Sequence, residues 1–320
     1  MTGFPLPVGS MPTVGYGCWK LGKDKAADIV EKVITMGYRH IDSASDYGNE
    51  KEVGLGLKRV IDKGICSRAD LFVTSKLWNT YHHPDNVLPA CKRTLSDLGL
   101  EYLDLYLIHF PISLKFVPFE TRYPPEWFHD PDAKDKKMEF EQVPVQDTWR
   151  AMEKLVDAGL VKNIGVSNWN CQGLRDLLSF ARIKPSVLQI ELHPYLQQPR
   201  LVNFAQSNGL VVTAFSPMGH GASYFNQNCS TLNEKIIQEI ATEKGVQPGQ
   251  VILRWGVQRG CAVIPKSEND DRIRQNLDVT GFELTDEEMK KIATIDRNMR
   301  FNDPGVFCPA AFNTECPIWD

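Results

Sequence analysis

Eight short segments with the composition of β-strands alternate along the chain with segments of helical period, and this alternation constrains the fold more than any other feature. The segments begin near residues 13, 38, 71, 103, 162, 186, 210 and 261. Two of them, LYLIHF and VVTAF, are apolar at nearly every position, which is typical of parallel strands covered on both faces. No change in composition marks a second domain. Eight strand–helix units in one domain predict a closed barrel. We therefore expect residues 1–320 to form a single (β/α)8 TIM-type barrel domain.

The segments between the strands have the pattern of amphipathic helices with recognisable ends. Residues 49–64 place apolar side chains at i, i+4, i+7 and i+8, and charged residues fill most of the opposite side. Residues 149–159 repeat this pattern and close at Gly159. Thr285 lies three residues before Glu288, which is the spacing of a capping box at the start of the last helix.

Two long segments interrupt the alternation. Residues 111–143, rich in proline, aromatic and charged residues, form an insertion after the fourth strand, and residues 297–320 form an irregular tail. Long loops in compact domains are usually functional. Because the insertion starts at the carboxyl end of a strand, we expect it to overhang the face where barrels of this type keep their active sites.

Composition excludes several other classes of protein. Lys plus Arg total 36 and Asp plus Glu 40, for a net charge of −4 and a pI near 6.0, so no basic excess favours nucleic-acid binding. With 42% hydrophobic residues the chain is not of the disordered type. No secretory signal and no run of 18 apolar residues is present, which predicts a cytoplasmic protein that binds no membrane. The eight cysteines include no CxxC pair and are interpreted as reduced thiols. Monomer and homodimer both remain open.

Four polar residues follow the ends of the second, third and fourth strands and suggest a proton relay. They are Asp42, Tyr47, Lys76 and His109. Adjacent strands lie about 4.8 Å apart, so consecutive strand ends can direct side chains at one point. We expect the Lys76 ammonium to lower the pKa of the Tyr47 phenol, and Asp42 to keep Lys76 charged. A neutral His109 would then donate a hydrogen bond to a carbonyl oxygen on which negative charge develops.

Each of these residues also has an ordinary structural interpretation, as a cap, a packing aromatic, a surface cation or a core histidine. A barrel enzyme that uses Lys76 as a Schiff-base nucleophile is a further alternative, although Asp42 would keep that amine protonated. Other sites have weak support. Gly15 and Gly17 lack the third glycine and the helix of a dinucleotide-binding turn, so we give that pair a structural role. The histidines lack the spacing of metal ligands, and no metal site is expected.

The sequence also resembles a known family. The stretches GYRHIDSASDYGNE, SKLWN, DLYLIHFP, IGVSN, LQIELHPY and IPKS are similar, in order and spacing, to the signature segments of the aldo-keto reductase superfamily, over about residues 8–304. HFPI followed by RYPPEW, and NLDVTGF followed by RFNDP, most resemble the fungal xylose (aldose) reductase branch. The resemblance implies NAD(P)H-dependent reduction of an aldehyde or ketone to an alcohol, with the cofactor extended across the top of the barrel.

The resemblance also implies roles for particular residues. The catalytic tetrad of the family falls on Asp42, Tyr47, Lys76 and His109, with Tyr47 as the proton donor. The residues that would contact the nicotinamide and the pyrophosphate are Ser167, Asn168, Gln189, Phe215, Ser216, Pro217, Met218 and Gly219. Those that would contact the adenosine 2′-phosphate and the adenine are Lys266, Ser267, Arg272, Gln275 and Asn276.

One residue departs from this cofactor pattern. Glu268 places a carboxylate two residues after Lys266, where a 2′-phosphate would lie. A carboxylate at such a position suits a ribose 2′-hydroxyl instead. We therefore expect the enzyme to use NADPH and also to accept NADH.

The substrate pocket is expected to be an aromatic wall with few polar groups. The residues assigned to it are Trp19, Trp78, His109, Phe110, Trp127 and Phe128, with Asp46 and Asn302 matching residues that hydrogen-bond a sugar hydroxyl in xylose reductases. These two favour an aldose such as xylose in its open-chain form. Met218, Gly219, His220 and the tail CPAAFNTECPIWD depart from the fungal pattern. Reduction of sugar phosphates or of lipophilic aldehydes and ketones, and a non-catalytic cofactor-binding barrel, are therefore the alternatives.

Overall fold

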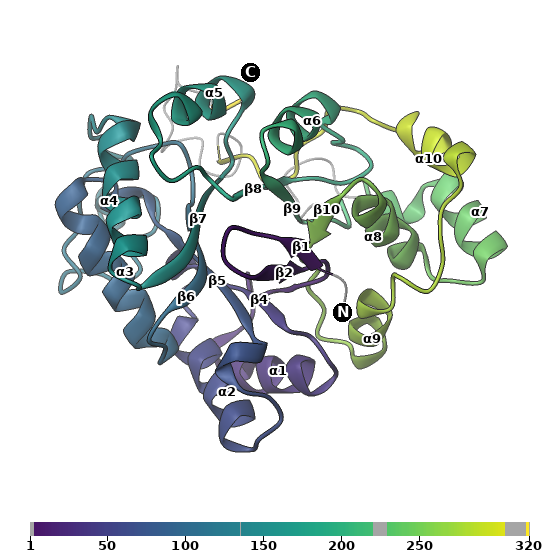
Figure 1. The fold of residues 1–320 in the computed structure, drawn as a ribbon, viewed down its shortest axis with the longest axis horizontal. Helices are drawn as coiled ribbons and strands as arrows, with labels where there is room; N and C mark the ends of the chain where they lie inside the picture. Colours follow the sequence, from purple (N-terminus) through teal and green to yellow (C-terminus); the bar gives the residue numbers. More distant parts are fainter. Residues whose placement is uncertain (1–2, 135, 220–228, 305–317, 320) are drawn as a thin grey trace.

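Eight parallel strands form a closed barrel in the computed structural model, which describes residues 3–134, 136–219, 229–304 and 318–319 (Figure 1). The sheet order is β10-β9-β8-β7-β6-β5-β4-β3. A parallel bridge between Val14 and Val263 joins the first strand to the last, and the Gly15 N–H donates to the Val263 carbonyl at 2.8 Å. The strands are β3 (Tyr16–Gly17), β4 (His40–Asp42), β5 (Phe72–Leu77), β6 (Leu103–Ile108), β7 (Val161–Ser167), β8 (Val187–Glu191), β9 (Val211–Phe215) and β10 (Cys261–Val263).

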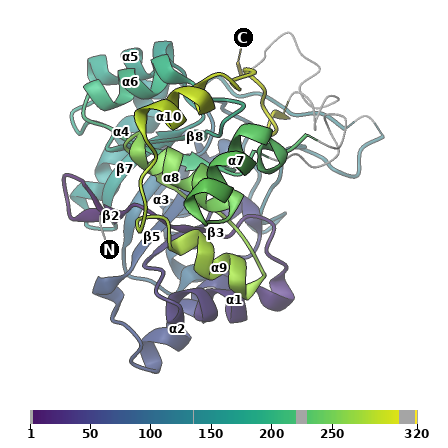
Figure 2. The same ribbon diagram turned by 90° about the vertical axis from the view of Figure 1, so that its right-hand side faces the viewer.

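The helices surround the barrel, and α7 to α10 lie along one side of it (Figure 2). Their bounds are α1 (Lys23–Thr35), α2 (Glu50–Asp62), α3 (Pro84–Leu98), α4 (Val145–Asp157), α5 (Cys171–Phe180), α6 (Pro199–Ser207), α7 (Lys235–Lys244), α8 (Pro248–Gln258), α9 (Asp270–Leu277) and α10 (Asp286–Ala293). The expected strands and the barrel are confirmed, and so are the amphipathic helices at α2 and α4. The capping box of Thr285 and Glu288 is present at the start of α10.

An N-terminal hairpin that the sequence did not predict covers one end of the barrel. Its strands, β1 (Gly3–Pro5) and β2 (Ser10–Pro12), are antiparallel and lie over the barrel centre in Figure 1. Asn163 of β7 holds the turn, because its amide donates to the Val8 carbonyl at 2.9 Å and accepts from the Val8 N–H at 3.1 Å. Met11 packs into an apolar layer with Phe72 and Leu105 at the amino ends of the strands. This end of the barrel is therefore closed.

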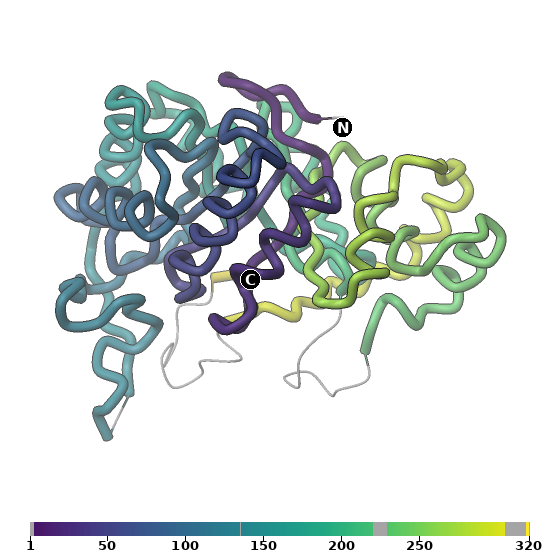
Figure 3. The backbone as a smooth tube through the Cα atoms, turned by 90° about the horizontal axis from the view of Figure 1, so that it is seen from below, coloured from purple at the N-terminus to yellow at the C-terminus, as the bar shows by residue number. Residues whose placement is uncertain are grey.

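The opposite end carries the loops that follow the strands (Figure 3). Within the insertion 111–143, an isolated bridge pairs Leu114 with Phe140, and Leu114 packs against Met138. Most of the expected irregular tail, 305–317, lies outside the described residues. The His40 side chain gives Gly15 its structural role, since a Cβ at Gly15 would lie 2.5 Å from His40 Nδ1. None of the described helices is both long and apolar enough to cross a bilayer.

Candidate active site

A cavity of about 1150 Å³ opens at the carboxyl ends of the strands. Most residues assigned to catalysis or binding from the sequence line it, although they come from segments far apart in the chain. They are Trp19, Asp42, Asp46, Tyr47, His109, Phe110, Trp127, Ser167, Asn168, Gln189, Phe215, Ser216, Pro217, Met218, Gly219, Lys266, Ser267, Glu268, Arg272, Gln275, Asn276 and Asn302. Three assigned residues, Lys76, Trp78 and Phe128, are not among the residues that line it.

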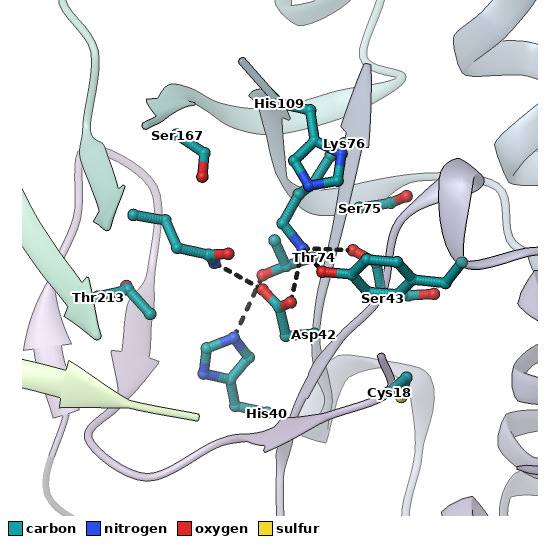
Figure 4. Close-up of polar contacts among 12 residues, drawn as sticks. Cys18, His40, Asp42, Ser43, Thr74, Ser75, Lys76, His109, Ser167 and Thr213 are labelled. Carbon is teal, nitrogen blue, oxygen red and sulfur yellow. Dashed lines mark hydrogen bonds and ion pairs between the residues drawn. The ribbon is translucent and has the colours of Figure 1, made fainter. Parts of the chain in front are cut away.

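Lys76 lies at the centre of a buried polar cluster at the floor of this cavity (Figure 4). Its ammonium donates to Asp42 Oδ1 at 2.6 Å, to the Ser43 carbonyl at 2.8 Å and to the Tyr47 hydroxyl at 3.0 Å. The other oxygen of Asp42 accepts from Gln189 Nε2 at 2.7 Å. Lys76 and Asp42 are 0% and 1% exposed, so the pair is removed from water with its polar atoms satisfied.

Strand register and one short turn explain how these side chains meet. Asp42 of β4 pairs with Thr74 of β5, two residues before Lys76, so both side chains point to the same face of the sheet. Tyr47 ends the 3₁₀ turn η1 (Ser45–Tyr47), which follows β4 directly. The Ser45 hydroxyl donates to the Lys76 carbonyl at 3.2 Å and thereby fixes this turn against β5.

The start of α2 is held behind Lys76 by a buried carboxyl group. Glu50 is 3% exposed and accepts hydrogen bonds from the Ser75 hydroxyl at 2.6 Å and the Thr94 hydroxyl at 3.1 Å. Burial raises the pKa of Glu50 to about 7, and these two hydrogen bonds only partly oppose that shift. Glu50 thus joins α2 to β5 and α3, but its ionised form is disfavoured there.

This carboxyl group makes stability depend on pH in a definite direction. Between about pH 4.5 and pH 7 the folded chain keeps a proton on Glu50 that the unfolded chain has lost, so the free energy of unfolding falls as pH rises through that window. Glu50→Gln keeps both hydroxyl partners without a charge. We expect urea denaturation to show a stability gain over wild type that grows to about 3 kcal/mol from pH 5 to pH 8. Glu287→Gln, at an exposed position of α10, is the control; an equal gain at both pH values would contradict the prediction.

The acidity of Tyr47 differs from the expectation. Burial raises the pKa of its phenol to about 12, and the opposing effect of Lys76 is smaller than the effect of burial. Asp42, which neutralises Lys76, adds to the rise. The expected lowering of this pKa was therefore wrong for the chain by itself. Tyr47 carries its proton throughout the neutral range, which is the state that a proton donor requires.

His109 stands beside Tyr47 as a neutral imidazole. Burial lowers the pKa of His109 well below its ordinary value, and the charge of Lys76 and the proximity of His82 lower it further. The rings of Tyr47 and His109 are 6.0 Å apart between centroids. A neutral imidazole offers one N–H donor to an oxygen in the cavity, as expected from the sequence.

Trp78 and Phe128 are corrections to the predicted substrate wall. Trp78 is fully buried, and its ring makes T-shaped contacts with the rings of His109 and Trp127, at centroid distances of 5.3 Å and 4.7 Å, so it supports the wall from behind. Phe128 packs instead in the small cluster around Leu114. Neighbouring aromatics in an irregular loop point in different directions, and no period in the sequence reveals which one faces the cavity.

Asp46 provides a polar group in this aromatic wall. Burial raises the pKa of Asp46 to about 7, and the nearby carboxylate of Glu126 raises it as well. A carboxyl group that titrates near neutrality can accept a hydrogen bond from a hydroxyl group or donate one to it. Asp46 is therefore suited to contact a hydroxylated ligand.

The cavity next to the tetrad also fits the carboxamide of a nicotinamide. Asn168 Nδ2 donates to the His109 carbonyl at 2.9 Å and to Ser167 Oγ at 3.1 Å. The buried Asn168 Oδ1 has no hydrogen-bond partner among the described residues. A buried acceptor is costly without a hydrogen bond, and the N–H of a carboxamide would supply one. Gln189 was expected to share this contact, but one of its amide N–H groups is already directed at Asp42.

Both the sequence and the fold of this chain match those of known proteins. Residues 13–297 match the model of the aldo/keto reductase family. The chain belongs to the aldo/keto reductase family. An NAD(P)H-dependent D-xylose reductase of Scheffersomyces stipitis is 52% identical over 92% of this chain and 93% of its own. An NADPH-dependent D-xylose reductase of Meyerozyma guilliermondii is 50% identical over 92% and 94%. The solved aldose reductase of Schistosoma japonicum covers 99% of this chain, with a TM-score of 0.86 and 39% identity.

In the part of the cavity lined by Lys266, the Glu268 carboxylate of this aldo/keto reductase contacts the basic groups that a phosphate would need. Its carboxylate lies 2.8 Å from the Lys266 ammonium and 3.8 Å from that of Lys25. The hydrogen bond and the charge of Lys266 lower the pKa of Glu268. Arg272 Nε donates to Ser267 Oγ at 3.3 Å. A 2′-phosphate entering here would have to displace the Glu268 carboxylate from Lys266.

Sequence reasoning missed part of the cavity wall. Lys20 lines it, with its ammonium 4.1 Å from the ring centroid of Trp19. Burial lowers the pKa of Lys20, and so does Lys266. The N-cap of α8 and the first residues of that helix, from Gln247 to Gln250, line it as well. Pro248 at the first position of that helix was an available signal for its start.

The Schiff-base alternative loses support in this geometry. Burial lowers the pKa of Lys76, but Asp42 and Tyr47 outweigh burial and raise it overall. A Schiff-base nucleophile needs a neutral amine, so this lysine is poorly suited to that role. Within the parts of the chain that the structure describes, no three His, Cys, Asp or Glu side chains gather closely enough to hold a metal ion.

Proposed function

We propose that this aldo/keto reductase reduces the aldehyde group of an open-chain aldose such as xylose to the alcohol, with NADPH as the reductant and NADH also accepted. The observation that carries the proposal is the Lys76–Tyr47 hydrogen bond of 3.0 Å at the floor of a cavity that extends to Lys266 and Arg272. The relatives named D-xylose reductases, at 50 to 52% identity, support the same substrate and cofactors.

Each residue of the tetrad has a distinct task in this proposal. When bound, a reduced nicotinamide supplies the hydride that goes to the carbonyl carbon. Tyr47 donates its proton to the carbonyl oxygen as negative charge develops there. Lys76 stabilises the phenolate that remains, and Asp42 holds the ammonium in place. His109 orients the carbonyl oxygen through its N–H and places a hydrogen-bond donor where negative charge develops.

The substrate-facing residues favour a small hydroxylated aldehyde. Trp19 and Trp127 line the cavity as apolar walls, while Asp46 and Asn302 provide polar contacts. Aromatic walls with a few polar groups are the usual construction of a small-molecule pocket. We therefore place a sugar hydroxyl between Asp46 and Asn302, with the aldehyde directed at Tyr47.

A spectrophotometric panel tests the substrate class. NADPH oxidation is followed with xylose, a sugar phosphate, an aromatic aldehyde and a ketosteroid, at matched concentrations. We expect xylose to be reduced more efficiently than the sugar phosphate and the ketosteroid. Efficient reduction of only the ketosteroid and the aromatic aldehyde would instead support the lipophilic alternative. No oxidation with any carbonyl compound would favour the non-catalytic barrel.

Glu268 gives a second prediction, on cofactor choice. Its contact with Lys266 opposes a 2′-phosphate, and its carboxylate suits a ribose hydroxyl. We expect Glu268→Ala to raise the ratio of kcat/KM for NADPH to that for NADH by about tenfold, the size expected when one charged contact changes. Steady-state kinetics with both cofactors at saturating xylose measure this ratio.

A matched variant separates a local effect from a change in net charge. Glu239→Ala removes an exposed glutamate of α7. Among the described residues, its one ion pair is with Lys235. This control should leave the cofactor ratio unchanged. An unchanged ratio in Glu268→Ala itself would show that this carboxylate does not select the cofactor.

Three further features belong to the proposal. The six described cysteines are free, which agrees with a cytoplasmic location, where thiols stay reduced and NADPH is available. Carbohydrate metabolism is the corresponding process. We retain a single barrel domain over residues 1–320, and a monomer or homodimer.

A further inference from the structure

A buried carboxylate that has no part in the proton relay holds the C-terminal segment at the cavity. Glu191, the last residue of β8, is 1% exposed. Its Oε1 accepts from the Phe301 N–H at 2.7 Å and its Oε2 accepts from the Asn302 N–H at 3.0 Å. His193 Nε2 lies 2.9 Å from Oε1. Three nitrogen atoms thus surround one carboxylate that water does not reach.

The residues that Glu191 holds are those that face the cavity. Phe301 and Asn302 both line it, and Asn302 Nδ2 also donates to Ser216 Oγ at 3.0 Å. The two backbone amides fix where this part of the chain crosses the end of β8. The Asn302 side chain therefore enters the cavity from a position set by a residue 111 positions earlier in the sequence.

This contact differs from the other attachments of the segment. Upstream, the Arg297 and Met299 amides both donate to the Tyr195 carbonyl at 3.0 Å, and Arg297 is paired with Glu234. Those contacts keep the segment on the barrel without reaching the residues that line the cavity. Glu191 acts at the cavity itself, and an unpartnered carboxylate there would be costly, so the amides are strongly required.

We propose that Glu191 is a positioning residue that holds Asn302 over the cavity through two backbone amides and thereby sets the preference for hydroxylated over unsubstituted aldehydes. The inference rests on the proposed function, because it assigns the Asn302 amide to a substrate hydroxyl. A carboxylate accepts both amide hydrogens at once. The isosteric amide of glutamine can accept only one of them and turns an NH2 group towards the other.

The test compares xylose with butanal, an aldehyde that is one carbon shorter and has no hydroxyl groups. We expect Glu191→Gln to raise KM for xylose by about tenfold with KM for butanal and the Kd for NADPH within about twofold of wild type. In an Asn302→Ala background the same change should have no further effect on the xylose-to-butanal ratio, because both act through one contact. Glu234→Gln, which loosens the same segment upstream, is the matched control and should leave the ratio unchanged.

Hydrogen exchange of the segment keeps the test decisive. The Phe301 and Asn302 amides should be protected in wild type and exchange faster in Glu191→Gln. If that variant does not fold, Glu191→Asp takes its place, because its side chain is one methylene shorter and holds the two amides less closely. Faster exchange together with a lower preference for xylose over butanal supports the inference. An unchanged preference in an enzyme that reduces xylose overturns the inference alone. A wild-type enzyme that reduces butanal but not xylose overturns the proposed substrate and this inference with it.

Discussion

Tyr47→Phe is expected to lower kcat for aldehyde reduction by about 10³-fold, the middle of the range for loss of a general acid. The variant removes the hydroxyl that lies 3.0 Å from the Lys76 ammonium and leaves the ring in place. The Kd for NADPH should stay within about twofold of wild type, because the proposed function assigns this hydroxyl to the substrate oxygen and not to the cofactor. Single-turnover absorbance measurements and fluorescence titration with NADPH give the two quantities.

A second tyrosine provides the control for loss of a buried hydroxyl. Tyr106 of β6 is fully buried and is not among the residues that line the cavity. Tyr106→Phe should leave kcat unchanged. Turnover above a tenth of wild type in Tyr47→Phe would mean that another group donates the proton.

Lys76→Met is expected to damage both stability and turnover. The substitution leaves Asp42, 1% exposed, without the ammonium that lies 2.6 Å from its Oδ1. Removing one partner of a buried ion pair costs about 3 to 5 kcal/mol, because the remaining charge is left uncompensated. The phenolate of Tyr47 would also lose its stabilising cation, so reduction should become too slow to measure with xylose.

A double variant distinguishes the two effects. Asp42→Asn combined with Lys76→Met removes the stranded charge, and the amide oxygen of the new asparagine side chain can still accept from Gln189. We expect this pair to recover most of the lost free energy of unfolding in urea denaturation, without recovering turnover. Restored turnover would show that the cation has no role in proton transfer, and an unrecovered stability would show that the pair is not coupled as proposed.

The sequence predicted the barrel well because strand and helix patterns are local. Runs such as residues 211–215 are apolar throughout most of their length, as a strand covered on both faces requires. The N-terminal hairpin escaped notice, since its short strands are broken by proline and glycine and have no period. Its position depends on Asn163, which lies 155 residues from Val8.

The site was predicted in outline but not in its details. Tyr47, Lys76 and His109 could be placed together because parallel strands end at one face. The pKa of Tyr47 could not be predicted from the sequence, since it depends on the balance between burial and the charge of Lys76. Trp78 was assigned to the cavity because it follows a strand, yet its indole N–H donates to the Glu126 carbonyl behind the wall.

The order of strands and helices, and the residue types at the strand ends, were determined by sequence alone, because hydrophobic period and turn chemistry act over a few neighbouring residues. The tertiary structure decided which groups touch. Lys76 reaches Tyr47 across 29 residues, and Glu191 reaches Asn302 across 111. Such contacts depend on how the barrel closes and on how deeply each group is buried, and local sequence patterns determine neither of these.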